Sequence, residues 1–267
     1  MEALMTKRAL KRMAREGAYE TSQYGDDAKV RRLPVDVRDR GNSWNPLGHD
    51  GAPNNPERDQ SYLKTIKPKS PGQAQLMEAI DEKNLVMALG PAGTGKTYIA
   101  IAKAVEALEA GRVNRIVLSR PAVEAGESIG YLPGDMEDKL APYLRPLYDA
   151  LTDRLSVKRM RALMAEGAIE IAPVGFMRGR TLNNAFVVID EAQNCTYMQL
   201  KMLLTRLGWH STMVVTGDPN QSDLLPGISG LADVADRFEA VSNIAVVRLA
   251  DRDIVRHPLV AEMLGVL

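Results

Sequence analysis

The sequence predicts an α/β fold, with a parallel sheet flanked by helices on both faces. Two observations lead to this prediction. Short runs of strand length that are apolar at nearly every position recur along the chain, and runs with helical spacing separate them. A strand that is apolar throughout is buried on both faces, which is typical of parallel sheets covered by helices. In addition, a glycine-rich stretch at 90–97 joins one such strand directly to a helix.

The expected elements begin at residue 70. Ser70-Pro71-Gly72-Gln73 is typical of a helix start, because serine caps helices well and proline is favoured in the first turn. A long helix is expected at about 136–166, where leucines recur on one face. The remaining expected elements are strands at 84–89, 115–119, 168–172, 186–190, 212–216 and 244–249, and helices at 98–108 and 198–207.

Residues 1–67 differ in composition from the expected folded domain at 68–267. Glycine, proline, asparagine and charged residues are frequent in this leader, and few of its residues could build a core. We therefore expect a flexible N-terminal leader. Its residues 6–15 could form one short basic helix, which would either contact nucleic acid or a neighbouring subunit, or remain a solvated tail.

Composition narrows the class of protein. Lys+Arg and Asp+Glu are balanced at 34 each, so bulk charge does not indicate a nucleic-acid-binding protein, although a local basic stripe would suffice. The single Cys195 cannot form an intramolecular disulfide, which fits a reducing compartment. No apolar run approaches the roughly 20 residues of a membrane span, and no secretory signal opens the chain. We therefore expect a cytoplasmic protein without a membrane partner, and no zinc site.

The stretch Gly90-Pro91-Ala92-Gly93-Thr94-Gly95-Lys96-Thr97 fits the phosphate-binding loop pattern G-x-x-x-x-G-K-[ST]. It lies between an apolar strand and a helix, as the motif requires. Its glycines let backbone N–H groups surround phosphate oxygens, and the helix N-terminus adds partial positive charge. Lys96 can reach the β- and γ-phosphates, and Thr97 can place its hydroxyl on Mg²⁺. The sequence thus predicts a P-loop NTPase.

Two acids end the apolar strand at 186–190. Asp190 can hold Mg²⁺ beside the phosphate loop, because ligands bind at the carboxyl ends of parallel strands. Glu191 directly follows and can activate an attacking water as a general base. The alternative is a solvated acidic turn. Paired acids disfavour a small-molecule kinase, which transfers phosphate to a bound hydroxyl.

Two glutamines are candidates for nucleotide contacts. Gln221 follows the strand at 212–216, where its amide can contact the γ-phosphate or the water. Gln73 lies 23 residues before Lys96, and an amide suits the adenine edge because it offers both a donor and an acceptor. Gln75 is a rival, and each glutamine could instead be an ordinary surface residue. Late arginines are candidates for stabilising charge in phosphoryl transfer, the alternative being surface salt bridges.

These features together resemble the PhoH-like family, the phosphate-starvation-inducible ATPases, and the first motor domain of superfamily 1 helicases. The resemblance covers about residues 68–267. It rests on the stretches 89–97, 119–123, 131–135, 142–149, 176–182, 190–194 and 255–260.

The resemblance implies a RecA-like core that uses ATP with Mg²⁺, a ring-shaped homo-oligomer of six subunits, and action on single-stranded RNA. Arg256 matches the family's terminal arginine, whereas Arg252 has no firm counterpart. We expect a neighbouring copy to supply Arg256 to the site; the alternative is that it folds back onto its own nucleotide. We expect no fused PIN-type nuclease domain, so a nuclease partner would act in trans.

Two functions follow as expectations. The first is an ATP-hydrolysing RNA helicase or translocase. The second is an ATP-dependent switch that partners a nuclease or ribosome-associated protein without unwinding. Arg120, at the end of the second strand, and Arg178 and Arg180, in a glycine-containing loop, are the candidate RNA contacts. The alternative for Arg120 and Arg180 is to bind the ATP phosphates or to pair with an acid such as Asp218 or Glu191.

Overall fold

The computed structural model describes residues 66–121 and 136–255. The strands are β1 (Leu85–Leu89), β2 (Arg115–Arg120), β3 (Ile169–Pro173), β4 (Ala185–Ile189), β5 (Thr212–Gly217) and β6 (Ile244–Arg248). The α-helices are α2 (Pro71–Glu82), α3 (Lys96–Glu109), α4 (Met136–Thr152), α5 (Val157–Ala165), α6 (Tyr197–Leu204) and α7 (Leu231–Phe238). Short 3-10 helices are η3 (Val174–Met177), η4 (Ala192–Asn194) and η5 (Asp251–Asp253).

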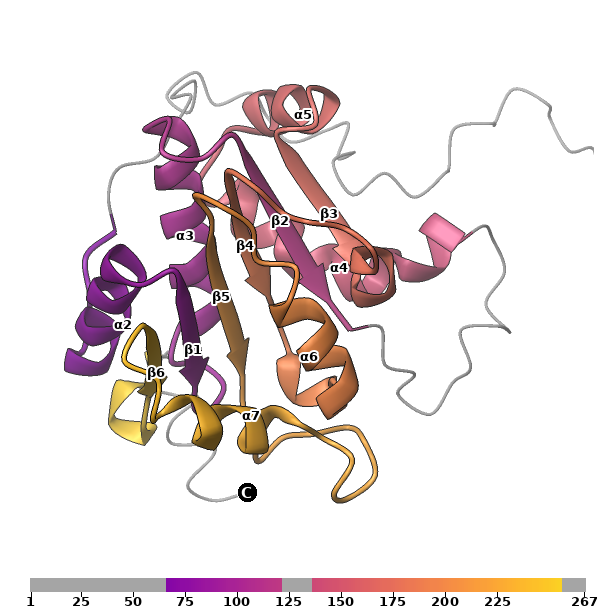
Figure 1. Ribbon diagram of the computed structural model, residues 1–267. Coiled ribbons are helices and arrows are strands. Elements are labelled where there is room, and N and C mark those ends of the chain that lie inside the picture. Colours follow the sequence, from indigo (N-terminus) through magenta and orange to yellow (C-terminus); the bar gives the residue numbers. More distant parts are fainter. Residues whose placement is uncertain (1–65, 122–135, 256–267) are drawn as a thin grey trace, which may run out of the picture. The chain divides into compact units, whose positions relative to one another are not determined.

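The strands form one parallel sheet in the order β3-β2-β4-β5-β1-β6 (Figure 1). β1 lies between β5 and β6, and its last residue, Leu89, is aligned with Gly217 and Arg248. β2 lies between β3 and β4. Because every pair is parallel, all carboxyl ends lie at one edge of the sheet. The predicted parallel sheet and its six predicted strands are confirmed.

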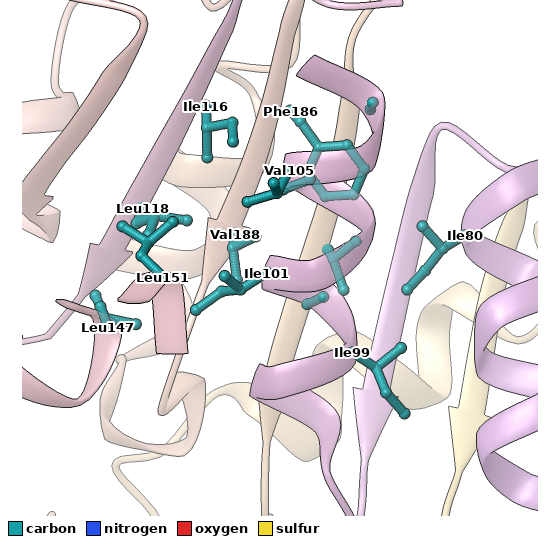
Figure 2. Close-up of a cluster of buried hydrophobic side chains, with 14 of the residues drawn as sticks. Ile80, Ile99, Ile101, Val105, Ile116, Leu118, Leu147, Leu151, Phe186 and Val188 are labelled. Atoms are coloured by element: carbon teal, nitrogen blue, oxygen red, sulfur yellow. The ribbon is translucent and has the colours of Figure 1, made fainter. Parts of the chain in front are cut away.

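Helices cover both faces of the sheet, and side chains of each strand alternate between two cores. Val86 and Ala88 of β1 join the core under α2, α3, α4 and α5, part of which is shown in Figure 2. Leu85, Met87 and Leu89 join the core under α6 and α7. Burial on both faces explains why the strand is apolar at every position.

The helix expected at 136–166 is in fact two helices, α4 and α5, and this expectation is corrected. The chain turns at 153–156, where Leu155 is buried and the Ser156 hydroxyl accepts a hydrogen bond from the backbone N–H of Arg159. A serine that caps in this way starts a new helix. The apolar periodicity continues through the break and so conceals it.

Two predicted regions lie wholly or mostly outside the described residues. They are the leader at 1–67, of which only Ile66 and Lys67 are described, and the segment that begins at Arg256. Within 66–121 and 136–255, no helix combines the length and the apolar character needed to cross a bilayer.

Candidate nucleotide-binding site

The phosphate loop connects β1 to α3 at the carboxyl edge of the sheet (Figure 1). At its start, the N–H of Gly90 donates to the carbonyl of Gly217 (3.2 Å), and a Cβ at Gly90 would lie 2.3 Å from the carbonyl oxygen of Leu249. At its end, Gly95 has a φ of 84° and accepts the first helical hydrogen bond from Ile99 (2.8 Å). Sterics therefore require glycine at both ends of the loop.

Lys96, the first residue of α3, folds back over this loop. Its Nζ donates to the carbonyl oxygens of Gly90 (2.6 Å) and Pro91 (2.8 Å), and the residue is only 9% exposed. Burial lowers the pKa of Lys96, while three carboxylates in the segments after β4 and β5 oppose that shift. An ammonium group so placed is a strong partner for phosphate oxygens.

Asp190 follows β4 and is 3% exposed. Its Oδ1 accepts hydrogen bonds from the hydroxyl of Thr97 (2.5 Å) and from the hydroxyl of Thr216 on β5 (2.6 Å). A hydroxyl and a carboxylate oxygen are thereby held together beside the phosphate loop. Mg²⁺ takes oxygen ligands and is usually bound through one or two carboxylates plus substrate phosphates. The residues present therefore fit this ion, and Thr97 and Asp190 are the side chains that would hold it.

Glu191 has a left-handed backbone, with a φ of 52°, which is uncommon for a residue other than glycine. Both of its carboxylate oxygens are held. Oε1 faces Nη2 of Arg120 at 3.4 Å, and Oε2 accepts a hydrogen bond from Nε2 of Gln193. Gln193 is 3% exposed, and its Oε1 accepts from the backbone N–H of Asp218 (3.1 Å). Gln193 therefore links the end of β4 to the end of β5.

Sequence reasoning assigned Gln193 no role. The available signal was its position two residues after Glu191, directly after an apolar strand. A buried amide needs partners for both its donor and its acceptor. In this protein the two partners are the acid of one strand end and the backbone of the next.

These groups converge on one cavity of about 510 Å³. Its walls include Lys96, Thr97, Asp190, Glu191 and Gln221. Small-molecule and cofactor sites usually have volumes of roughly 300–1,000 Å³. A cavity of this size, lined by a phosphate loop, a hydroxyl–carboxylate pair and a second acid, suits a nucleoside triphosphate.

A family model described as "PhoH-like protein" matches residues 65–267. The chain belongs to the PhoH family. The PhoH-like proteins of Bacillus subtilis (strain 168) and Mycobacterium tuberculosis (strain H37Rv) are 52% and 54% identical to it over 202 and 201 residues. Each alignment covers 75% of this chain, but 63% and 57% of the relatives, so the chain spans about three-fifths of their length.

Among solved structures, the large terminase of a thermophilic bacteriophage is similar to this chain, with a TM-score of 0.48 and 13% identity. That similarity covers 74% of this chain and 50% of the terminase chain.

In this member of the PhoH family, Gln73 lies on α2 against the phosphate loop and is 6% exposed. Its Nε2 donates to the carbonyl of Thr94 (3.0 Å), and its Oε1 accepts from the N–H of Lys69 (2.8 Å). The amide thus supports the loop from behind and also lines the cavity. Gln75, the rival for the adenine contact, is exposed and does not line it.

Gln221 lies where the sequence predicts it, at the wall of the cavity after β5. Its backbone N–H donates to the carbonyl of Asp218 (3.1 Å), and its side chain is exposed. The amide is therefore free to turn toward a ligand. Asp218 itself is 6% exposed, and its Oδ1 accepts from the N–H of Asn220 (3.0 Å).

The structure separates the three candidate arginines for RNA contact. Arg120 lies inside the site, 3.6 Å from Asp190 and 3.4 Å from Glu191, which is the acid pairing considered as an alternative. Arg180 forms two 2.6 Å hydrogen bonds with Glu170; they raise the pKa of Arg180 and lower that of Glu170. In the part of the chain that the structure describes, no hydrogen bond or ion pair holds Arg178, which is exposed.

The segment after β6 is hydrogen-bonded both to the start of α2 and to the phosphate loop. Asp253, 2% exposed, accepts hydrogen bonds from the N–H groups of Ala250 (3.0 Å) and Gly72 (3.1 Å). The bond from Ala250, followed by those from Ser70 and Gly72, lowers the pKa of Asp253. Two residues further on, Val255 donates to the carbonyl of Gly93 (2.9 Å). Sequence reasoning missed the contact of Asp253 with Gly72, which joins residues 181 positions apart.

Proposed function

We propose that this protein hydrolyses ATP in a Mg²⁺-dependent reaction coupled to the binding of single-stranded RNA, as a cytoplasmic RNA helicase or translocase. The observation that carries the ATPase proposal is the 2.5 Å contact between Thr97 and Asp190. It brings the end of the phosphate loop to the acid pair in one cavity. RNA as the partner rests on the family resemblance.

Each residue of the site has a proposed role in binding or hydrolysing ATP. Backbone N–H groups of 90–97 and the ammonium group of Lys96 bind and orient the phosphates. Thr97 and Asp190 would hold Mg²⁺, which would neutralise charge on the transferred phosphate. Glu191 accepts a proton from the attacking water at a carboxylate oxygen. Gln73, which lines the cavity, contacts the adenine edge, and Gln221 contacts the γ-phosphate or the water.

The test of this function is the rate of ATP hydrolysis by the full chain with and without single-stranded RNA. RNA-stimulated, Mg²⁺-dependent hydrolysis together with strand separation on tailed RNA duplexes supports the helicase. Stimulated hydrolysis without strand separation or movement supports the alternative, an ATP-dependent switch that partners a nuclease or ribosome-associated protein. Absence of hydrolysis under every condition contradicts both.

Gln193→Ala is expected to slow ATP hydrolysis about 10–100-fold, the loss typical of one hydrogen bond to a charged group. The variant leaves Oε2 of Glu191 and the N–H of Asp218 without their partner. Gln199→Ala is the matched control, because Gln199 is also a glutamine that hydrogen bonds to backbone, in the cap of α6. Steady-state kinetics should place the loss mainly in kcat. Equal rates for the two variants would show that Gln193 does not position the acid.

We also propose a ring of six subunits in which Arg256 completes the site of a neighbouring copy. Family resemblance supports the shared site, whereas the bond from Val255 to Gly93 of the same chain favours the alternative that Arg256 serves its own nucleotide. Lys96→Ala and Arg256→Ala subunits are expected to recover part of the ATPase activity when mixed, because some boundaries would contain both intact parts. No recovery in verified mixed oligomers, or a fully active monomer in solution, would reject the shared site.

A further inference from the structure

A short turn at the carboxyl end of β3 exposes an aromatic ring. The turn is η3 (Val174–Met177), and its first and last residues are buried, with Val174 at 4% and Met177 at 0% exposure. Between them, Phe176 is 62% exposed. The chain's other two phenylalanines, Phe186 and Phe238, pack against the two cores of the protein.

The chain that follows the turn is held in place by Arg180. Arg180 pairs with Glu170 on β3 through two hydrogen bonds of 2.6 Å, and its backbone carbonyl accepts from Nη1 of Arg206 (3.1 Å). Met177 anchors the middle of the segment in the core. Phe176 and Arg178 are therefore presented on a backbone that is already ordered, so the protein loses little conformational entropy when a ligand binds them.

The surroundings of the ring are open. Among the described residues, a Cβ built on Gly175 or Gly179 would meet no atom within 4 Å. Arg178, between the ring and Gly179, is exposed, and within 66–121 and 136–255 no partner holds its guanidinium group. A protein interface needs a broad apolar core, and one ring between bare glycines and a cation does not provide it. An exposed ring beside an arginine suits a nucleotide, because the ring can stack on the base and the guanidinium group can bind the phosphate.

The turn also lies close to the nucleotide site. Pro173, the last residue of β3, is aligned with Arg120, the last residue of β2. Arg120 in turn lies 3.4 Å from Glu191. A ligand on the turn would therefore be one strand away from the arginine that contacts the acid.

We propose that Phe176 and Arg178 form a subsite for single-stranded nucleic acid, in which a base stacks on the ring and the guanidinium group binds an adjacent phosphate. Stacking on an aromatic ring tolerates any base, because every base has a π-face. The proposal rests on the function proposed above and names a residue, Phe176, that carries part of its binding energy.

The test is the affinity of the full chain for two fluorescein-labelled single strands. One is an oligonucleotide of about 20 uridines, long enough to cover a typical single-strand site. The other is a strand of the same length with abasic positions. Phe176→Ala should weaken binding of the uridine strand roughly 10-fold, the size expected for one stacked base, and should not weaken binding of the abasic strand. Phe176→Trp should bind the uridine strand as tightly as the wild-type protein does. Arg178→Ala should weaken both strands and reduce the slope of log affinity against log salt by about 1.

Two control variants remove the same kinds of side chain elsewhere. Trp209→Ala removes an 81% exposed aromatic residue before β5, at the opposite end of the strands, and Arg112→Ala removes a half-exposed arginine before β2. Both should bind like wild type. The stacking subsite alone is overturned if the wild-type protein binds the single strand and Phe176→Ala binds it with the same affinity. It is also overturned if Phe176→Ala loses the same affinity for the uridine and the abasic strands. A wild-type protein that binds no single strand overturns the subsite and the RNA-coupled function together.

Discussion

Lys96→Ala is expected to abolish ATP hydrolysis. Lys96 is the buried cation of the phosphate loop, and its ammonium group donates to two carbonyl oxygens of the loop, which phosphate oxygens would replace as its partners. Without it, the negative charge that develops on the phosphates in the transition state loses the cation that the phosphate loop supplies. The measurement is phosphate release at saturating ATP, together with the affinity for a labelled ATP analogue.

Lys103→Ala is the matched control for this variant. Lys103 lies on the same helix, two turns beyond Lys96, and is also buried, but it pairs with Asp81 at 2.6 Å away from the cavity. Its loss should lower the free energy of unfolding and leave turnover per folded molecule near that of wild type. If both lysine variants hydrolyse ATP at the wild-type rate, the phosphate loop is not the site of hydrolysis.

Glu191→Gln is expected to slow hydrolysis by roughly 10²–10⁴-fold, the usual worth of general-base catalysis. Glutamine keeps the shape of the side chain but cannot accept the proton of the attacking water. ATP should therefore still bind and remain uncleaved on the protein, which single-turnover measurements with labelled ATP would detect.

Glu109→Gln supplies the comparison for this variant, because it also neutralises an acid that pairs with an arginine. Glu109 lies 3.1 Å from Arg159, at the far end of α3 from the phosphate loop. Turnover in this control should be unchanged. Normal hydrolysis by Glu191→Gln would place the base elsewhere and leave Glu191 as a partner of Arg120.

The main features of the fold and site could be predicted because they depend on local patterns. The spacing of glycine, lysine and threonine in 90–97 predicts the phosphate loop, and the short apolar runs predict the strands. Parallel strands share one carboxyl edge, so Thr97 and Asp190 are predicted to lie at the same edge of the sheet. Their 2.5 Å contact depends in addition on the strand order β4-β5-β1, which the strand assignments leave open.

The pairing of polar side chains could not be predicted in the same way. Arg120 at a strand end could contact a phosphate or an acid, and the choice depends on side-chain directions on neighbouring strands, which the sequence does not encode locally. The bonds of Gln73 to Thr94 and of Asp253 to Gly72 likewise depend on packing between distant segments. The break at Ser156 was hidden because one apolar stripe continues across two helices.

The position of β1 in the sheet has a consequence for synthesis of the chain. Both edges of β1 pair with strands made much later, β5 from Thr212 and β6 from Ile244. At roughly 5–20 residues per second, the ribosome needs on the order of ten seconds to extend the chain from Leu89 to β5. During that time Leu85–Leu89, five apolar residues, lacks its native partners. The strand that carries the phosphate loop is thus among the last to be completed, and until then it is an apolar segment with unpaired backbone.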